Sequence, residues 1–99
     1  MDSAMNISVV TDVLYPVFRK YDIRRAILFG SVAKGTATKE SDLDICVDSN
    51  LKGLRFLGFL EEVKQAVQMD VDLLDVTHID KGSRVEDEIQ KTGVVIYEK

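Results

Sequence analysis

The sequence predicts one small α/β (α+β) domain with a mixed β-sheet flanked by helices. Apolar residues at helical spacing alternate along the chain with short apolar runs that are typical of strands. The connections on either side of the second run are short, and parallel neighbours need longer crossovers, so a purely parallel sheet is disfavoured. The 99 residues, 45% hydrophobic and 30% charged, suffice for one domain with one core, which we predict over residues 1–99.

The first half of the chain predicts two helices, each followed by a strand. A first helix contains Pro16, which removes a backbone donor and predicts a kink or a broken turn. The expected elements are a helix over 6–21, a strand over 26–30, a short helix from Ser31 to near Gly35 and a strand over 42–48. Residues 36–41 are polar and predict a loop between the last two elements.

The second half predicts the longest helix, over residues 53–69, and then strand, helix and strand over 70–76, 84–92 and 94–97. The helix over 84–92 has capping-box spacing at its start and a glycine at its end. The longest helix carries more apolar residues than one buried face needs, so Phe56 and Phe59 belong either to the core or to a partner surface. Its expected buried stripe consists of Leu54, Leu57, Leu60, Val63 (or the stem of Lys64) and Val67.

Composition limits the classes of function. Apolar runs reach only about five residues, whereas a membrane-spanning helix needs roughly 20. Met1–Ala4 lack the basic and apolar regions of a signal peptide. The single cysteine, Cys46, lies in an apolar strand and is interpreted as a small buried hydrophobe, in keeping with a reducing cytoplasm. A net charge of −4 argues against nucleic acid as a direct substrate, because domains that grip phosphate backbones are usually basic.

A pair of aspartates marks the strand over 42–48. Asp42 and Asp44 are two residues apart, so both side chains leave one face of the strand, opposite Leu43 and Ile45. Aspartate is a poor strand former, and like charges this close repel each other unless a cation lies between them. Oxygen ligands favour Mg²⁺ or Mn²⁺. The alternative is a strand with a solvated polar face.

A third carboxylate strengthens the metal hypothesis. In Asp70-Val71-Asp72-Leu73-Leu74-Asp75, the acids at 70 and 72 share one face, and Asp75 points the other way. If this strand lies beside the strand over 42–48, one of the two acids can approach the same metals. Three converging carboxylates suit two-metal phosphoryl transfer.

A Gly-Ser turn follows the first strand. Gly30 allows a sharp turn and a close approach to a ligand, and Ser31 begins a helix whose free N–H groups favour anions. Its hydroxyl is a further donor for a phosphate oxygen. Alone, a Gly-Ser pair after a strand is common and usually marks an ordinary turn.

Gly30-Ser31, followed about ten residues later by Asp42-Leu43-Asp44-Ile45, resembles the signature of the DNA polymerase β nucleotidyltransferase superfamily, in particular its minimal (MNT) members. The resemblance implies a palm-like fold, a third acid at Asp72 and two bound Mg²⁺ ions. It also implies that Gly30 and Ser31 bind the nucleotide phosphates. Lys34 stands where many members carry arginine, and lysine lacks the bidentate fork of arginine; it is either a phosphate contact or a surface lysine.

The family resemblance implies transfer of AMP from ATP to a hydroxyl, with release of pyrophosphate. Asp42 and Asp44 would hold both metals, and Asp72 would hold the catalytic metal and orient or deprotonate the acceptor. Free-standing MNT proteins accompany a helical HEPN ribonuclease toxin, so the expected role is an antitoxin that modifies a tyrosine of that partner. Two alternatives stay open: inhibition by binding alone, and a small-molecule transferase that needs a helical partner subunit.

Overall fold

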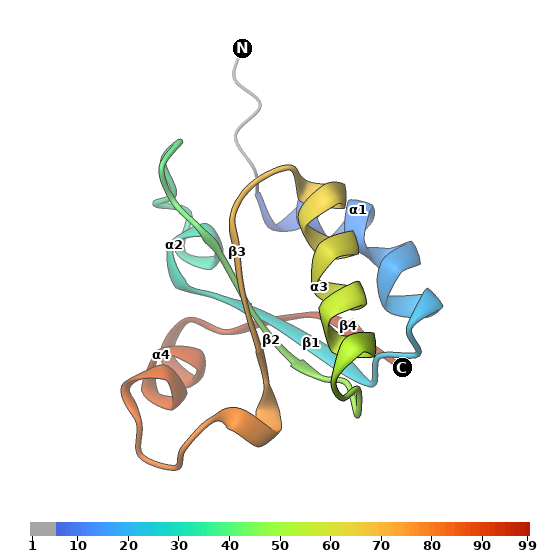
Figure 1. Ribbon diagram of the computed structural model, residues 1–99. Helices are drawn as coiled ribbons and strands as arrows, with labels where there is room; N and C mark the ends of the chain where they lie inside the picture. Colours follow the sequence, from blue (N-terminus) through green and yellow to red (C-terminus); the bar gives the residue numbers. More distant parts are fainter. Residues whose placement is uncertain (1–5) are drawn as a thin grey trace.

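The computed structural model describes residues 6–99, and its elements alternate as the sequence predicts (Figure 1). The interpretation of Met1–Ala4 lies outside the described residues, and the single domain over 1–99 stays a prediction. No helix among residues 6–99 is long and apolar enough to cross a membrane. The elements are α1 (Ile7–Lys20), β1 (Arg25–Phe29), α2 (Gly30–Lys34), β2 (Leu43–Asp48), α3 (Leu54–Val67), β3 (Val71–Asp75), the 3-10 helix η1 (Val76–His78), α4 (Arg84–Thr92) and β4 (Val94–Glu98).

The four strands form one sheet in the order β3-β2-β1-β4. β1 runs antiparallel to both β2 and β4, whereas β2 and β3 are parallel. The parallel pair is possible because α3 lies between its strands in the sequence and supplies the long crossover that such a pair requires. The expectation of a short connection on both sides of β2 is therefore wrong for the side after β2. The prediction of a mixed sheet is confirmed.

The core lies between one face of the sheet and the helices α1 and α3, which lie side by side on it (Figure 1). Leu43, Ile45 and Val47 all face this core and are fully buried, as their alternation predicts. Cys46 points to the opposite face and is also buried, so its interpretation as a small hydrophobe is confirmed. α1 runs through Pro16 as one helix, and the alternative of a broken turn is wrong.

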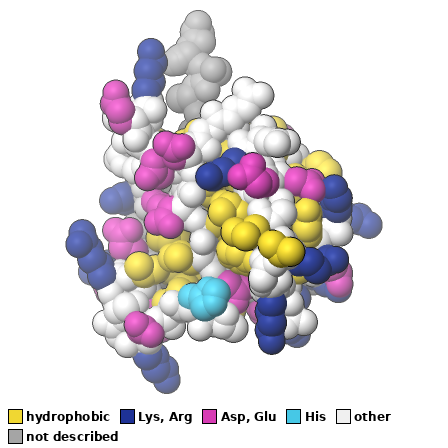
Figure 2. All heavy atoms as spheres, in the orientation of Figure 1, with side chains coloured by type: hydrophobic (Ala, Val, Ile, Leu, Met, Phe, Trp, Pro, Cys, Tyr) yellow, Lys and Arg dark blue, Asp and Glu magenta, His cyan; other side chains and the backbone are white. Residues whose placement is uncertain are grey.

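The predicted stripe on α3 is wrong in its first half. The side chains of Leu54 and Leu57 are 83% and 55% exposed, whereas Phe59 is fully buried. The rings of Phe18 and Phe59 pack with their centroids 6.1 Å apart, which turns the first two leucines away from the core. Figure 2 shows hydrophobic side chains exposed over α3. Val63 and Val67 are buried as predicted.

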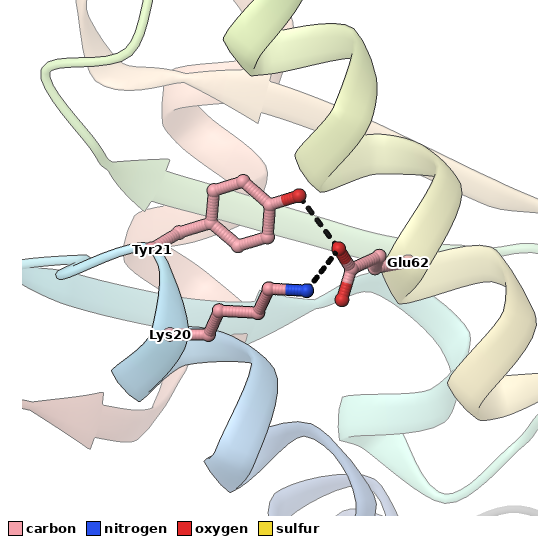
Figure 3. A network of polar contacts seen from close by, with 3 residues as sticks. All are labelled: Lys20, Tyr21 and Glu62. Carbon is pink, nitrogen blue, oxygen red and sulfur yellow. Dashed lines mark hydrogen bonds and ion pairs between the residues drawn. The ribbon is translucent and has the colours of Figure 1, made fainter.

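A polar contact joins the two core helices at the surface (Figure 3). One carboxylate oxygen of Glu62 in α3 accepts from Lys20 Nζ at 2.8 Å and from the Tyr21 hydroxyl at 2.7 Å. Both donors come from the end of α1. The side chains of Lys20 and Glu62 are 63% and 34% exposed, so this ion pair adds little to the free energy of unfolding.

Candidate functional site

The sheet topology gathers the predicted site residues at one end of the sheet. β1 ends at Phe29, which pairs with Asp44 at the start of the antiparallel strand β2, so the turn at Gly30 comes next to that start. β3 runs parallel to β2, so its own start lies at the same end, with Asp72 in register with Asp44. Three segments far apart in the sequence therefore meet there.

The Gly30 turn lies directly against the carboxylate of Asp44. Gly30 has φ +77°, a left-handed conformation that glycine adopts without strain. A Cβ at this position would collide with Oδ2 of Asp44. The backbone angle therefore favours glycine after β1, and a Cβ there would in addition require the Asp44 carboxylate to rotate away.

The three predicted acids differ in exposure. Asp44 is half-buried, whereas Asp42, just before β2, and Asp72 are exposed. Neighbouring residues of a parallel pair project from the same face, so Asp44 and Asp72 share the face opposite the core. Asp72, rather than Asp70, is thus the register partner of Asp44. Asp42 lies outside the regular strand, two residues before Asp44.

The surroundings of Asp44 are strongly acidic. The pKa of its carboxyl is raised to about 6, and burial is the largest cause. Three neighbouring carboxylates also raise this pKa, in decreasing order those of Asp72, Asp42 and Glu88. Within residues 6–99, no hydrogen-bond donor reaches the Asp44 side chain. Figure 2 shows acidic side chains over this region, between α2, β3 and α4.

The donor set fits a hard divalent cation in chemistry but is not assembled as a cluster. Carboxylate oxygens are the ligands that Mg²⁺ and Mn²⁺ prefer, and mutual repulsion at Asp44 is the electrostatic feature that a cation relieves. Across the part of the chain that the structure describes, however, no three His, Cys, Asp or Glu side chains stand close enough to hold one ion. The shared binding of one metal by Asp42, Asp44 and Asp72 therefore stays a prediction.

The predicted phosphate residues lie on α2. Ser31 is half-buried in the first turn of this helix, and its backbone carbonyl accepts from the N–H of Thr36 at 3.0 Å. Lys34 is exposed in the last turn. Ser31 directly follows Gly30, which lies against Asp44, and Lys34 lies farther along the same helix.

Two residues of α4 belong to the surroundings of the site and were not predicted. The Glu88 carboxylate acts on Asp44, and the hydroxyl of Thr92 accepts a hydrogen bond from the N–H of Gly30 at 3.1 Å. The sequence places both in the last turns of a helix but carries no signal that this helix packs beside the Gly-Ser turn. That contact depends on the tertiary structure alone.

Residues 13–99 match the family model described as polymerase beta, nucleotidyltransferase. The chain belongs to this family. The resemblance inferred from Gly30-Ser31 and Asp42-Leu43-Asp44 is thereby confirmed for the family as a whole, and the chain is a nucleotidyltransferase by membership.

A curated relative in the nucleotidyltransferase family is the "Putative protein adenylyltransferase" of Methanocaldococcus jannaschii. It is 30% identical to this chain over 78 residues, which are 76% of this chain and 83% of that protein. A second protein of the same name from this organism is 34% identical over 59 residues, 56% of this chain and 59% of that protein.

Solved structures of toxin–antitoxin complexes share the nucleotidyltransferase fold. A chain of a toxin–antitoxin crystal structure with AMP-PNP matches with a TM-score of 0.75 and 22% identity, covering 90% of this chain and 73% of that one. A chain from the complex of a tri-AMPylated Shewanella oneidensis HEPN toxin with its MNT antitoxin gives 0.70 and 18% identity, covering 94% and 73%. These likenesses establish the fold class predicted from the sequence.

Proposed function

We propose that this nucleotidyltransferase transfers AMP from ATP to a tyrosine hydroxyl of a helical HEPN-type toxin and thereby acts as its antitoxin in the cytoplasm. The observation that carries the proposal is the register of Asp44 with Asp72 beside the Gly30 turn. The adenylyltransferase name of the archaeal relatives supports AMP transfer, and the AMPylated HEPN toxin in a neighbouring structure supports a partner of that kind. The single buried cysteine is in keeping with the reducing compartment.

The proposed roles follow the positions of the residues. Ser31, with the turn at Gly30, binds the terminal phosphates of ATP, and Lys34 adds a positive charge from the end of α2. Asp42, Asp44 and Asp72 hold two divalent ions, Mg²⁺ or Mn²⁺. When bound, these ions neutralise phosphate charge and lower the pKa of the attacking hydroxyl.

The proposed reaction transfers AMP from ATP to the tyrosine hydroxyl, with one bond formed and one bond broken. The phenolic oxygen forms a bond to the α-phosphorus of ATP, and the bond from that phosphorus to the pyrophosphate oxygen breaks. Asp72 is exposed and accepts the proton that the hydroxyl releases. The products are an AMP-modified tyrosine and pyrophosphate.

Intact-mass spectrometry of a co-purified complex tests this proposal. The chain is co-expressed with a HEPN-type partner, and the partner is weighed before and after incubation with ATP and Mg²⁺. We expect a gain in whole AMP units, lost in the double variant Asp42→Asn/Asp44→Asn. Asp48→Asn, on the same strand and face as Asp44, is the matched control and retains the gain. A stable complex whose partner never gains mass would instead indicate inhibition by binding.

A further inference from the structure

The backbone N–H of Gly30, the first residue of the Gly-Ser turn, donates a hydrogen bond to a residue 62 positions later in the chain. α2 begins at Gly30, and its N-cap residue, Phe29, contributes no side-chain hydrogen bond. The N–H groups of a first helical turn have no acceptor within the helix, so they need one elsewhere. For Gly30 this acceptor is the hydroxyl of Thr92 at 3.1 Å.

The Thr92 hydroxyl is itself oriented. It donates its proton to the backbone carbonyl of Glu88 at 2.9 Å, which leaves its lone pairs to face the Gly30 N–H. The hydroxyl therefore acts once as donor and once as acceptor, and the chain of two bonds fixes its rotamer. Valine has the same shape without either bond, and serine keeps both.

The end of α4 that carries Thr92 is fixed against the sheet. α4 contacts both β1 and α2. A Cβ at Gly93, the residue after Thr92, would lie 2.9 Å from Cγ2 of Ile27 in β1, so the backbone there is packed as tightly as glycine allows. Thr92 consequently lies next to a closely packed point of the backbone.

We propose that Thr92 is a positioning residue that sets the distance between the phosphate turn and Asp44. Gly30 lies against the Asp44 carboxylate on one side and is bonded to Thr92 on another. Release of the second contact lets the turn move relative to the acid, and sites of this kind lose function with displacements of about 0.5–1 Å. This inference rests on the proposed nucleotide-binding role of the turn.

The test compares three variants of the full chain. Thr92→Val removes both hydrogen bonds and Thr92→Ser keeps them. Thr11→Val is the matched control, because the Thr11 hydroxyl donates to the carbonyl of Ile7, four residues earlier, at 2.7 Å in α1, away from the site. Two quantities are measured: the dissociation constant of a non-hydrolysable ATP analogue with Mg²⁺, by calorimetry, and the hydrogen-exchange rate of the Gly30 amide, by NMR.

We expect Thr92→Val to weaken analogue binding roughly fivefold, the effect of one neutral hydrogen bond, and to accelerate Gly30 exchange. Thr92→Ser is expected to bind within about twofold of the unchanged chain, and Thr11→Val to alter neither quantity. Equal effects of the two valine variants would overturn the inference, as would a fast-exchanging Gly30 amide in the unchanged chain, a measurement that does not depend on how the variants fold. If the unchanged chain binds no analogue, the proposed function fails, and the exchange rates still decide whether Thr92 holds the turn.

Discussion

Asp44 and Asp75 are carboxylates withdrawn from water at opposite ends of two neighbouring strands, and they are treated in opposite ways. Asp75, at the end of β3, accepts four hydrogen bonds, from the backbone and hydroxyl groups of Ser49 and Thr77, at 2.6–3.1 Å. Burial raises the pKa of Asp75, but these bonds outweigh it and hold the value below normal. Asp44, at the start of β2, has acidic neighbours and no donor among residues 6–99, and its pKa is raised to about 6.

The difference shows that Asp75 has a structural role, whereas the carboxylate of Asp44 is left without a hydrogen-bond donor among residues 6–99 and can interact with a ligand. The hydrogen-bonding capacity of Asp75 is used to join β3, η1 and the segment after β2. The carboxylate of Asp44 lies among other carboxylates at the end of the sheet where the Gly-Ser turn lies, and its pKa is raised. A perturbed pKa of this kind is typical of sites that bind cations or carry out chemistry. One sheet thus contains both uses of an aspartate, about 30 residues apart in the sequence.

The largest expected effect is the loss of AMP transfer on substitution of Asp44, at the end of the sheet where the acidic residues gather. Asp44→Asn preserves the shape of the side chain but removes its charge, so AMP transfer is expected to fall more than about 100-fold, beyond the loss from changing a group that only supports a ligand. The measurement is the rate of AMP incorporation into a HEPN-type partner. Asp48→Asn is the matched control on the same strand. Equal activity of the two variants would remove Asp44 from the site.

The next effect is on stability, at the opposite end. Asp75→Ala leaves the donors of Ser49 and Thr77 without their acceptor and is expected to lower the free energy of unfolding by about 3 kcal/mol at pH 7. Because the folded-state pKa of Asp75 is lowered, its contribution is present above the usual aspartate value near 4 and is lost as pH falls through the folded value. Urea unfolding at neutral and acidic pH checks both statements. A cost below about 1 kcal/mol at pH 7 would contradict the structural role.

Removal of the charge of Asp44 is expected to raise the free energy of unfolding, whereas the change at Asp75 is expected to lower it. The folded-state pKa of Asp44 lies near 6, above the unfolded value near 4, so charging it penalises the fold above pH 6, and the penalty vanishes as pH falls to 4. Asp44→Asn is therefore expected to stabilise the ligand-free protein by about 1 kcal/mol at pH 7, after allowance for solvent screening of a half-exposed group. Urea unfolding at pH 7 and pH 4 measures the gain, and an equal gain at both values would refute this electrostatic explanation.

The smallest effect is expected at a third carboxylate, on the surface. Glu62 accepts from Lys20 and Tyr21, and its pKa is lowered by these hydrogen bonds (Figure 3). Because the pair is solvent-exposed, Glu62→Gln is expected to lower the melting temperature only slightly, and less at high salt. Thermal unfolding at low and high salt measures it. A loss as large as that of Asp75→Ala would show that donor number, rather than burial, determines the cost.

The sequence predicted those features that depend on local pattern or on motif spacing. Helical and strand periodicity placed every strand to within two residues. The sequence also raised the pairing of the strand over 70–76 with the strand over 42–48 as a condition for the site, and β2 and β3 do pair, with Asp44 in register with Asp72. The metal-binding and phosphate-binding roles of these residues stay predictions.

The remaining features depend on tertiary packing, which periodicity does not encode. Leu54 and Leu57 are exposed because the face of α3 that packs on the core is the one that carries Phe59. Thr92 reaches Gly30 only because α4 packs beside α2. The sequence predicted that Asp75 points away from Asp72. It carried no signal that the hydroxyl donors around Asp75 come from the segment after β2 and from η1.

The mixed sheet also determines when the parts of the site come together during folding. Gly30 and Asp44 meet through antiparallel pairing of strands joined by a short segment, so only a small loop has to close. Asp72 arrives only with the parallel pairing of β2 and β3, across the whole of α3. Non-local pairing of this kind is the slower event. We therefore expect Gly30 and Asp44 to come together before Asp72 joins them, so that the register of Asp44 with Asp72 is formed late in folding.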